Sequence, residues 1–205
     1  MSSDARVEPL DGAIFWLFGL SGAGKSALAS GLAAELRAQS WAVLALDGDD
    51  LRGGLCRGLG FSDADRAENL RRAAEVARLG ARSGLCVVAS FITPLNCHRE
   101  LVTGIVGRRN LSLIHLDAPL QVCRERDVKG LYAQARLGKV PLMTGISSAF
   151  EVPETADLVI HTAGESLAAS SARLLEFSLS QLHKPGFSLG RQVNPAPAST
   201  GPNCA

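Results

Sequence analysis

The sequence has little of what marks a membrane, secreted or nucleic-acid-binding protein. No apolar run reaches the roughly 18 residues that a bilayer-spanning helix needs. Residues 1–12, MSSDARVEPLDG, carry acidic side chains and no apolar core, which argues against a secretory signal. The 21 lysines and arginines nearly balance the 20 aspartates and glutamates, which argues against a large nucleic-acid-binding surface. We therefore expect a soluble, cytoplasmic protein that binds neither membrane nor nucleic acid.

Cysteine is also scarce and follows no pattern. The five cysteines are Cys56, Cys86, Cys97, Cys123 and Cys204, with no C-x-x-C pair and no spacing typical of a metal site. An odd number of scattered cysteines favours reduced thiols over a disulfide framework. A chain of 205 residues with 46% apolar residues can bury a core without such cross-links.

Short apolar runs alternate with longer helical patterns along most of the chain. This alternation predicts an α/β fold in three layers, with a mostly parallel five-stranded sheet and helices on both faces. The expected strands are 13–18, 42–47, 85–91, 111–117 and 156–162, each apolar on both faces as buried parallel strands are. The expected helices are 24–39, 63–82, 96–108, 119–125 and 165–182.

Two segments interrupt the alternation. Residues 124–150 are polar, basic and rich in glycine, and they are too long for a simple connection, so they are expected to carry function. Residues 183–205 are rich in proline, glycine and serine and are expected to be a disordered tail. The remaining residues, 1–182, are expected to form a single domain.

The sequence GLSGAGKS, residues 19–26, matches the phosphate-binding pattern G-x-x-x-x-G-K-[ST]. It follows an apolar strand and opens a helix rich in alanine and leucine, which is the context that distinguishes this P-loop from a glycine-rich turn that binds nothing. Lys25 is expected to reach the β- and γ-phosphates, and Ser26 to offer its hydroxyl to Mg²⁺. The predicted nucleotide contacts are Gly19, Leu20, Ser21, Gly22, Ala23, Gly24, Lys25 and Ser26.

The P-loop alone does not separate kinases, GTPases and motor ATPases. The chain lacks the N-K-x-D signature of a guanine site, and motor or transporter ATPases are usually much longer. A short chain with a basic segment beside a P-loop favours a small-molecule kinase that uses ATP. The fold expected for the domain is therefore that of a P-loop NTPase, with residues 124–150 as its lid.

Two expected strands end in aspartate, at the edge of the sheet where α/β proteins bind ligands. After Asp47 the sequence continues DGDDLR, and carboxylates so close together repel one another unless a cation lies among them, although a solvent-facing turn also tolerates them. We interpret Asp47, together with Ser26, as a magnesium site, with Asp47 bound directly or through water. Asp117 precedes a helix start and is interpreted as its structural cap.

Segments after the P-loop narrow the function further. LDGDDLRGGL (46–55), GFSDADRAENLRRAAEVARL (60–79), SFITPL (90–95), RDVKGLYAQARLGK (126–139) and TGI (144–146) follow it in this order. Together they resemble the adenylyl-sulfate kinase family, which phosphorylates the 3′-hydroxyl of adenosine 5′-phosphosulfate with ATP. The resemblance spans about residues 12–160, nearly all of the expected fold.

The resemblance implies an acceptor site that matches the chemistry of the residues. Arg52 and Arg66 carry forked, permanently charged donors suited to phosphosulfate oxygens. Asn69 lies one helical turn after Arg66 and therefore on the same face. Phe61 is expected either to stack on the purine or to fill the core. The implied acceptor contacts are Asp49, Arg52, Phe61, Arg66, Asn69, Ile92, Thr93 and Lys129.

The same resemblance implies the catalytic residues Lys25, Asp49 and Lys129. Asp49 is expected to orient the attacking hydroxyl and accept its proton. The basic lid residues Arg126, Lys129 and Arg136 are expected to close over the ATP and exclude water. Arg126 is counted among the ATP contacts, and Mg²⁺ is the implied cofactor.

The sequence departs from the family pattern beside the acceptor site. Family members usually have serine, a ring and arginine where this chain has Thr93, Leu95 and Asn96. DGDD replaces the usual DGDN, and TGISS lacks the acid that commonly follows TGI. We expect activity with weaker acceptor binding.

The family resemblance also implies a homodimer and a functional association with ATP sulfurylase, to which some relatives are fused. Two alternatives remain open from the residues. One is a P-loop kinase for another small hydroxylated acceptor, such as a sugar acid or an antibiotic. The other is a regulatory subunit that binds nucleotide without turnover and docks onto a sulfurylase, although Lys25, Ser26 and Asp49 are all present.

Overall fold

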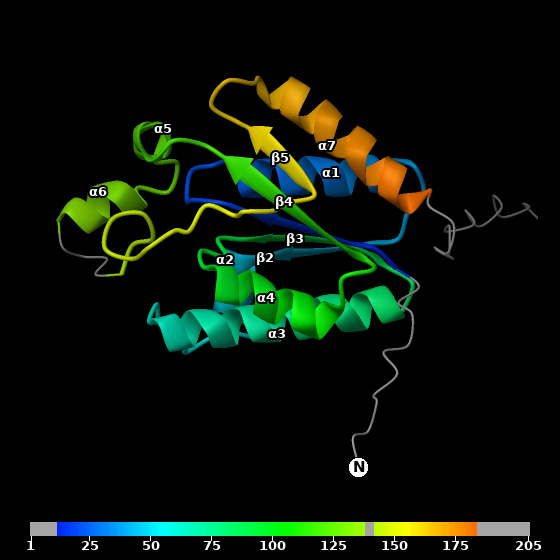
Figure 1. Cartoon of the computed structure of the whole chain (residues 1–205), viewed down its shortest axis with the longest axis horizontal. Coiled ribbons are helices and arrows are strands. Elements are labelled where there is room, and N and C mark those ends of the chain that lie inside the picture. The colour runs from blue at the N-terminus through cyan, green and yellow to red at the C-terminus, as the bar shows by residue number, and fades with distance from the viewer. Residues whose placement is uncertain (1–11, 138–141, 184–205) are drawn as a thin grey trace, which may run out of the picture.

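The computed structural model describes residues 12–137 and 142–183, so nearly all of the expected tail and part of the expected lid lie outside the described residues. Within them, five parallel strands form one sheet in the order β2-β3-β1-β4-β5 (Figure 1). The strands are β1 (Ile14–Phe18), β2 (Val43–Asp47), β3 (Cys86–Phe91), β4 (Leu111–Asp117) and β5 (Leu158–His161). The expected α/β fold and its five strands are confirmed.

Seven helices are present in the described part of the chain. They are α1 (Lys25–Ala38), α2 (Gly48–Gly53), α3 (Asp63–Arg82), α4 (Asn96–Val106), α5 (Leu120–Arg126), α6 (Leu131–Arg136) and α7 (Leu167–Leu182). Helices α1 and α7 cover one face of the sheet and α3 and α4 cover the other, which gives three layers (Figure 1). None of the described helices is both long and apolar enough to cross a bilayer.

The central strand β1 divides the core because its side chains alternate between the two faces of the sheet. Phe15 and Leu17 join the apolar cluster under α1 and α7, whereas Trp16 and Phe18 join the cluster under α3 and α4. All five residues of β1 are buried, as expected for a strand covered on both sides. Strand β2 has the expected apolar residues, but it is an edge strand and only partly buried, and its Ala45 is exposed.

Helix α3 begins and ends where its sequence predicts. The Ser62 hydroxyl caps the helix by accepting from the backbone N–H of Asp65 at 3.1 Å. Its apolar stripe, which includes Leu70, Ala73 and Ala77, is buried against the sheet. Gly84 follows the last turn with φ 78, a left-handed conformation that glycine adopts without a Cβ penalty.

Two short helices and one cap differ from expectation. Helices α2 and α6 have six residues each, too few for a 3.6-residue apolar period to register in the sequence. The reading of Asp117 as a helix cap is wrong, because Pro119 occupies the N-cap of α5. The Asp117 carboxylate instead lies 2.9 Å from Nδ1 of His161, which joins β4 to β5 at their carboxyl ends.

Candidate active site

One cavity of about 680 Å³ lies at the carboxyl ends of the strands. Open α/β sheets bind ligands at this edge because their loops and helix N-termini converge there. The lining combines the P-loop, the end of β2, the first half of α3, the turn after β3 and the lid segment. Its predicted site residues are Ser21, Gly22, Ala23, Gly24, Lys25, Ser26, Asp47, Asp49, Arg52, Phe61, Arg66, Asn69, Ile92, Thr93, Arg126 and Lys129.

The P-loop owes its shape to glycines with positive φ, of which Gly22 and Gly24 lie in its second half. Gly22 has φ 80, and a Cβ there would lie 2.7 Å from the carbonyl oxygen of Cys123. Gly24 has φ 95 and is the N-cap of α1, so the unpaired N–H groups of the helix start face the cavity region. Such a loop and helix terminus form an anion site.

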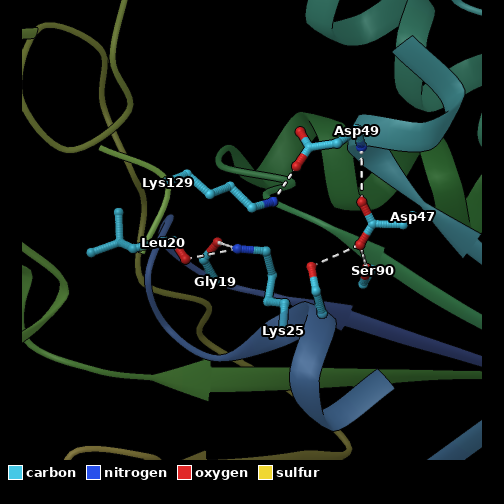
Figure 2. A network of polar contacts seen from close by, with 8 residues as sticks. Gly19, Leu20, Lys25, Asp47, Asp49, Ser90 and Lys129 are labelled. Carbon is cyan, nitrogen blue, oxygen red and sulfur yellow. Dashed lines mark hydrogen bonds and ion pairs between the residues drawn. The ribbon is translucent and has the colours of Figure 1, made fainter. Parts of the chain in front are cut away.

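Lys25 points back onto the loop that carries it. Its ammonium donates to the carbonyl oxygens of Gly19 at 3.0 Å and Leu20 at 2.7 Å (Figure 2). Burial lowers the pKa of Lys25 to about 8, because the charged form is removed from water. Gly19 and Leu20 therefore contact the lysine through their carbonyls and do not themselves line the cavity.

Asp47 is the centre of a polar network at the end of β2 (Figure 2). One carboxylate oxygen accepts from the hydroxyls of Ser26 at 2.8 Å and Ser90 at 2.6 Å, and the other accepts from the backbone N–H of Asp49 at 2.9 Å. Burial alone would raise the pKa of Asp47, but the hydrogen bonds from Ser90, Asp49 and Ser26 together bring its pKa below the ordinary value. The carboxylate is therefore held ionised, and the oxygen that Ser26 reaches is suited to a hard cation.

Asp49 is the second residue of α2. Its side chain is exposed and faces the lid. Its carboxylate forms an ion pair with the ammonium of Lys129 (Figure 2). The hydrogen bond to Asp49 raises the pKa of Lys129, so the lysine stays charged. The two predicted catalytic residues on the acceptor side are thus brought together.

The two predicted acceptor arginines flank one aromatic ring. The guanidinium carbon of Arg52 lies 4.4 Å, and that of Arg66 5.7 Å, from the ring centroid of Phe61. Phe61 is 49% exposed and lines the cavity, so the alternative that it fills the core is wrong. Burial lowers the pKa of Arg66, and the positive charge of Arg52 lowers it further. Two like charges at one end of a cavity favour an anion there.

Backbone carbonyls hold both arginines in place. Arg52 donates to Leu59 at 3.2 Å and to Gly60 at 2.8 Å. Arg66 donates to Phe61 at 3.0 Å and to Leu142, in the lid segment, at 2.5 Å. The guanidinium groups are therefore oriented by the fold before any ligand binds.

Asn69 and the turn after β3 complete this end of the cavity. Asn69 lies one turn after Arg66 on α3, is 4% exposed, and its Oδ1 has no hydrogen-bond partner among the described residues. A buried amide oxygen without a partner is costly in a protein interior, so a ligand donor there is favourable. Ile92 and Thr93 line the cavity beside it, and the carbonyl of Ile92 accepts from the backbone N–H of Gly19 at 3.3 Å.

The lid contains more ordered structure than expected from its composition. Gly130, which has φ 65, is the N-cap of helix α6, and Tyr132 of this helix is buried with its hydroxyl donating to the carbonyl of Ser21 at 2.9 Å. Arg126 donates to the carbonyl of Thr162 at 2.5 Å and lines the cavity, as predicted. Arg136 is exposed and is not among the described cavity-lining residues, so its closure over the nucleotide stays a prediction.

Two residues at the site, Ser90 and Thr162, were not predicted from the sequence. Ser90 lies within the segment SFITPL, and its role comes from the bond of its hydroxyl to Asp47, which lies 43 residues earlier in the chain. Thr162 donates to the carbonyl of Ala23 at 3.0 Å and joins the end of β5 to the P-loop. Both residues lie at or just after the carboxyl end of an expected strand, and polar residues at such positions could have been considered as site residues.

The sequence matches the family model described as adenylylsulphate kinase over residues 11–161. The chain belongs to the adenylyl-sulfate kinase family. The adenylyl-sulfate kinase of Shewanella amazonensis is 47% identical over 169 residues, 82% of this chain and 85% of that protein. The adenylyl-sulfate kinase of Aeromonas hydrophila is 48% identical over 162 residues, 79% of this chain and 82% of that protein.

The comparison with solved structures also finds an adenylyl-sulfate kinase. The chain is similar to the APS kinase CysC of Mycobacterium tuberculosis, solved in complex with AMPPNP and APS, with a TM-score of 0.79 and 40% identity. The alignment covers 83% of this chain and 99% of that one. The predicted family, its P-loop kinase fold and its class as an ATP-dependent kinase are therefore confirmed.

Proposed function

We propose that the protein transfers the γ-phosphoryl group of ATP to the 3′-hydroxyl of adenosine 5′-phosphosulfate, which yields ADP and 3′-phosphoadenylyl sulfate. One observation carries this proposal: a single cavity is lined both by the P-loop and by the guanidinium groups of Arg52 and Arg66, with Asp49 on the same cavity. The amides of the P-loop suit the phosphates of ATP, and the paired guanidinium groups suit a phosphosulfate. The cavity thus provides places for two anionic substrates.

The acceptor end supports a nucleotide acceptor over a plain sugar acid. Beside the arginines, Phe61 presents an exposed ring that can stack on a purine, and Asn69 has an unpartnered amide oxygen. A sugar acid has no aromatic part for the ring. We assign Arg52 and Arg66 to the phosphosulfate, Phe61 to the purine, and Asn69 with the Ile92–Thr93 backbone to the remainder of the acceptor.

We assign Asp49 to the attacking hydroxyl. The bond from O3′ to the γ-phosphorus forms while the bond from that phosphorus to the β-γ bridging oxygen breaks, ADP leaves, and the hydroxyl proton passes to the Asp49 carboxylate. Phosphoryl transfer depends more on an in-line, correctly oriented hydroxyl than on a strong base. Lys25 and Lys129 supply positive charge beside the transferred group, as Lys25 reaches the β- and γ-phosphates and Lys129 lies on the lid.

The residues at the end of β2 fit a Mg²⁺ ion that accompanies ATP. The Ser26 hydroxyl and the Asp47 carboxylate, 2.8 Å apart, are hard oxygen donors of the kind that Mg²⁺ prefers. Among the described residues no group of three or more His, Cys, Asp or Glu side chains could hold a metal by itself. Ser26, Asp47 through water, and phosphate oxygens are therefore the proposed ligands, and the bound ion supplies neutralising charge to those oxygens.

The lid segment would close the site against water. Arg126, Lys129 and Tyr132 each contact the body of the protein at the cavity, through Thr162, Asp49 and Ser21. A closed site favours the acceptor hydroxyl over water as the nucleophile.

The decisive experiment is a titration of the purified protein with MgATP and adenylyl sulfate, in which ADP and the 3′-phosphorylated product are both measured. Stoichiometric formation of the two products is expected. Equal or faster ADP release with gluconate alone would favour a sugar-acid kinase. ATP binding without turnover at saturating adenylyl sulfate would favour a regulatory subunit.

We also propose a homodimer in a reducing compartment, the cytoplasm. Leu55 and Leu79 are exposed apolar residues; Leu79 lies on α3, and Arg72 of the same helix donates to the carbonyl of Leu55 at 2.9 Å. Cys56, Cys86 and Cys123 are buried free thiols, as expected where disulfides do not form. Light scattering of the purified protein tests the dimer. Co-purification with ATP sulfurylase, which makes the acceptor, tests the proposed association.

A further inference from the structure

The turn after β3 contains a backbone conformation that its residue type disfavours. Thr93 has φ 42, in the left-handed region, where a β-branched side chain is strained. Thr93 is 1% exposed and, with Ile92, lines the acceptor end of the cavity. Such a conformation persists only where the surroundings hold it, and it occurs most often at functional sites.

Two buried donors hold Thr93 from opposite sides of the residue. The indole N–H of Trp16 donates to the Thr93 hydroxyl at 2.9 Å. The guanidinium of Arg99 donates to the Thr93 carbonyl at 3.0 Å. Trp16 comes from β1 and Arg99 from α4, so the turn is tied to the central strand and to the helix that follows it.

Arg99 also ties the turn to the end of the lid segment. The guanidinium donates to the carbonyl of Glu151 at 3.0 Å and to the side-chain oxygen of Asn96. Glu151 makes two further bonds to the turn. Its backbone N–H donates to the carbonyl of Pro94 at 2.8 Å, and its carboxylate accepts from the backbone N–H of Asn96 at 2.6 Å. The acceptor turn and the segment that leads out of the lid are therefore one hydrogen-bonded unit.

Neither donor is placed to touch a substrate. Trp16 and Arg99 are 0% and 5% exposed, and neither is among the described residues that line the cavity. Trp16 stacks on Phe91 with ring centroids 4.8 Å apart, and the Arg99 guanidinium lies 5.3 Å from the ring centroid of Phe18. Their effect on the reaction is therefore indirect. For Arg99 it passes through the turn and Glu151, and for Trp16 it passes through the turn and Phe91, which lines the cavity.

We propose that Trp16 and Arg99 are positioning residues that clamp Thr93 in its left-handed turn, so that the Ile92–Thr93 backbone meets the acceptor in the orientation needed for transfer. The inference rests on the proposed function, because it concerns the adenylyl sulfate end of the cavity. Misplacing a substrate by about 1 Å costs roughly 10²-fold in rate, so loss of either bond to Thr93 should have a measurable effect.

The test compares Thr93→Val, Trp16→Phe and Arg99→Met with wild type in steady-state transfer to adenylyl sulfate. Thr93→Val keeps the shape of the side chain and removes only the acceptor of the indole bond, and Arg99→Met keeps an apolar stem over Phe18. We expect KM for adenylyl sulfate to rise about tenfold and kcat to fall about tenfold. The Kd of a non-hydrolysable ATP analogue, measured by calorimetry, should change by less than about threefold, because the bond that joins the turn to the P-loop, from the Gly19 N–H to the Ile92 carbonyl, involves none of the three altered side chains.

Conservative variants and a distant arginine separate positioning from general stability. Thr93→Ser and Arg99→Lys, which keep one hydrogen bond each, should lose less than Thr93→Val and Arg99→Met. Arg108→Met is the matched control, because Arg108 also bonds several partners, Asp157 and the Leu111 carbonyl, but at the opposite ends of β4 and β5. It should lower the melting temperature and leave KM unchanged.

Each outcome decides between the inference and the function. Wild-type KM and kcat in folded Thr93→Val and Arg99→Met would overturn the clamp alone. A wild-type protein that transfers no phosphate to adenylyl sulfate would overturn the proposed function, and the clamp with it. If Arg99→Met fails to fold, Thr93→Val alone decides. A rise in KM for adenylyl sulfate with little change in the Kd of the ATP analogue supports the clamp, and an equal loss of both affinities counts against it.

Discussion

The ammonium of Lys129 is paired with the carboxylate of Asp49, 80 residues earlier in the chain. Lys129 lies between α5 and α6 of the lid segment, whereas Asp49 lies at the start of α2, directly after β2. Both side chains are at least half exposed, so the pair is worth little to stability and a substrate can replace either partner. Its importance is therefore positional, since it brings the lid over the acceptor side of the cavity.

Lys129→Ala should uncouple lid closure from transfer. We expect kcat to fall about 10- to 100-fold, and the ratio of ATP hydrolysis to phosphoryl transfer to rise, because water is less well excluded. The melting temperature should be nearly unchanged, because exposed ion pairs contribute little to stability. The control is Arg71→Ala, which removes another exposed ion pair, that of Arg71 with Glu68. Product analysis that separates free phosphate from 3′-phosphoadenylyl sulfate is the measurement. An unchanged ratio would contradict the lid assignment.

Asp49→Asn should show whether this carboxylate receives the proton. The amide keeps the shape of the side chain and loses the basic oxygen, so kcat should fall about 10²- to 10³-fold while the Kd of ATP changes little. Asp50→Asn is the matched control, because Asp50 is the next residue of α2 and is not among the described cavity-lining residues. Rapid-quench measurement of a single turnover isolates the chemical step. Similar losses in both variants would argue for a general charge effect.

Arg66→Ala should weaken acceptor binding more than it slows chemistry. The variant removes a charge-assisted hydrogen-bond donor, a loss of about 1.5–3 kcal/mol, and so should raise KM for adenylyl sulfate about 10- to 100-fold. The control is Arg72→Ala, from the same helix, whose guanidinium pairs with Glu68. Arg66 also holds the Leu142 carbonyl, so a smaller rise in KM for ATP is compatible with the assignment. No change in acceptor KM would place the phosphosulfate elsewhere.

ATP affinity should depend on pH through Lys25. Burial lowers the pKa of Lys25 to about 8 in the free protein, whereas bound phosphates favour its charged form and raise the pKa again. The contribution of Lys25 to ATP affinity is therefore fully present below about pH 8, where the lysine is already charged. It is lost as the pH rises above that value, because ATP binding must then include the uptake of a proton by Lys25. Calorimetry at pH 8.5 in buffers of different ionisation enthalpy should detect that uptake. Lys25→Met should abolish turnover and flatten the pH dependence, and a sloping profile in this variant would assign it to another group.

Ser90→Ala should weaken the use of Mg²⁺. Loss of the 2.6 Å bond to Asp47 leaves that carboxylate less well oriented, and its pKa should move back up toward the ordinary value. Removal of such a supporting hydrogen bond typically costs about 10- to 100-fold in metal affinity. The measurement is the Mg²⁺ concentration for half-maximal rate at constant ATP, with Ser112→Ala in β4 as the control. The same concentration in both variants would count against Asp47 as part of the metal site.

Local pattern was sufficient for most of the fold and for the identity of the site. Alternating apolar runs predicted all five strands to within about two residues, because buried parallel strands must be apolar. GLSGAGKS predicted the phosphate loop, since its glycines are required by backbone geometry at Gly22 and Gly24. Helix α3 was predicted at both ends because its cap residues act within one turn.

Elements that depend on distant contacts were not predictable in this way. Helices α2 and α6 are too short to show a period, and α6 is fixed in part by the bond of Tyr132 to Ser21, 111 residues away. The bond between Ser90 and Asp47 joins neighbouring strands whose pairing only the sheet order reveals. Asp117 looked like a cap from its position in the chain, but its partner His161 comes from the adjacent strand β5.

Short-range sequence patterns are enough to specify which chemical groups this protein has: a loop of amides with a lysine, carboxylates at the end of β2 and just after it, and arginines in α2 and α3. These follow from patterns within a few residues, where covalent geometry and helix or strand periodicity set the relation between side chains. Three relations could be found only in the folded chain: Asp49 pairs with Lys129, Ser90 supports Asp47, and Thr93 is held by Trp16 and Arg99. Those relations join residues far apart in the chain, and their distances depend on how the packed layers place the strand ends and helices around one cavity.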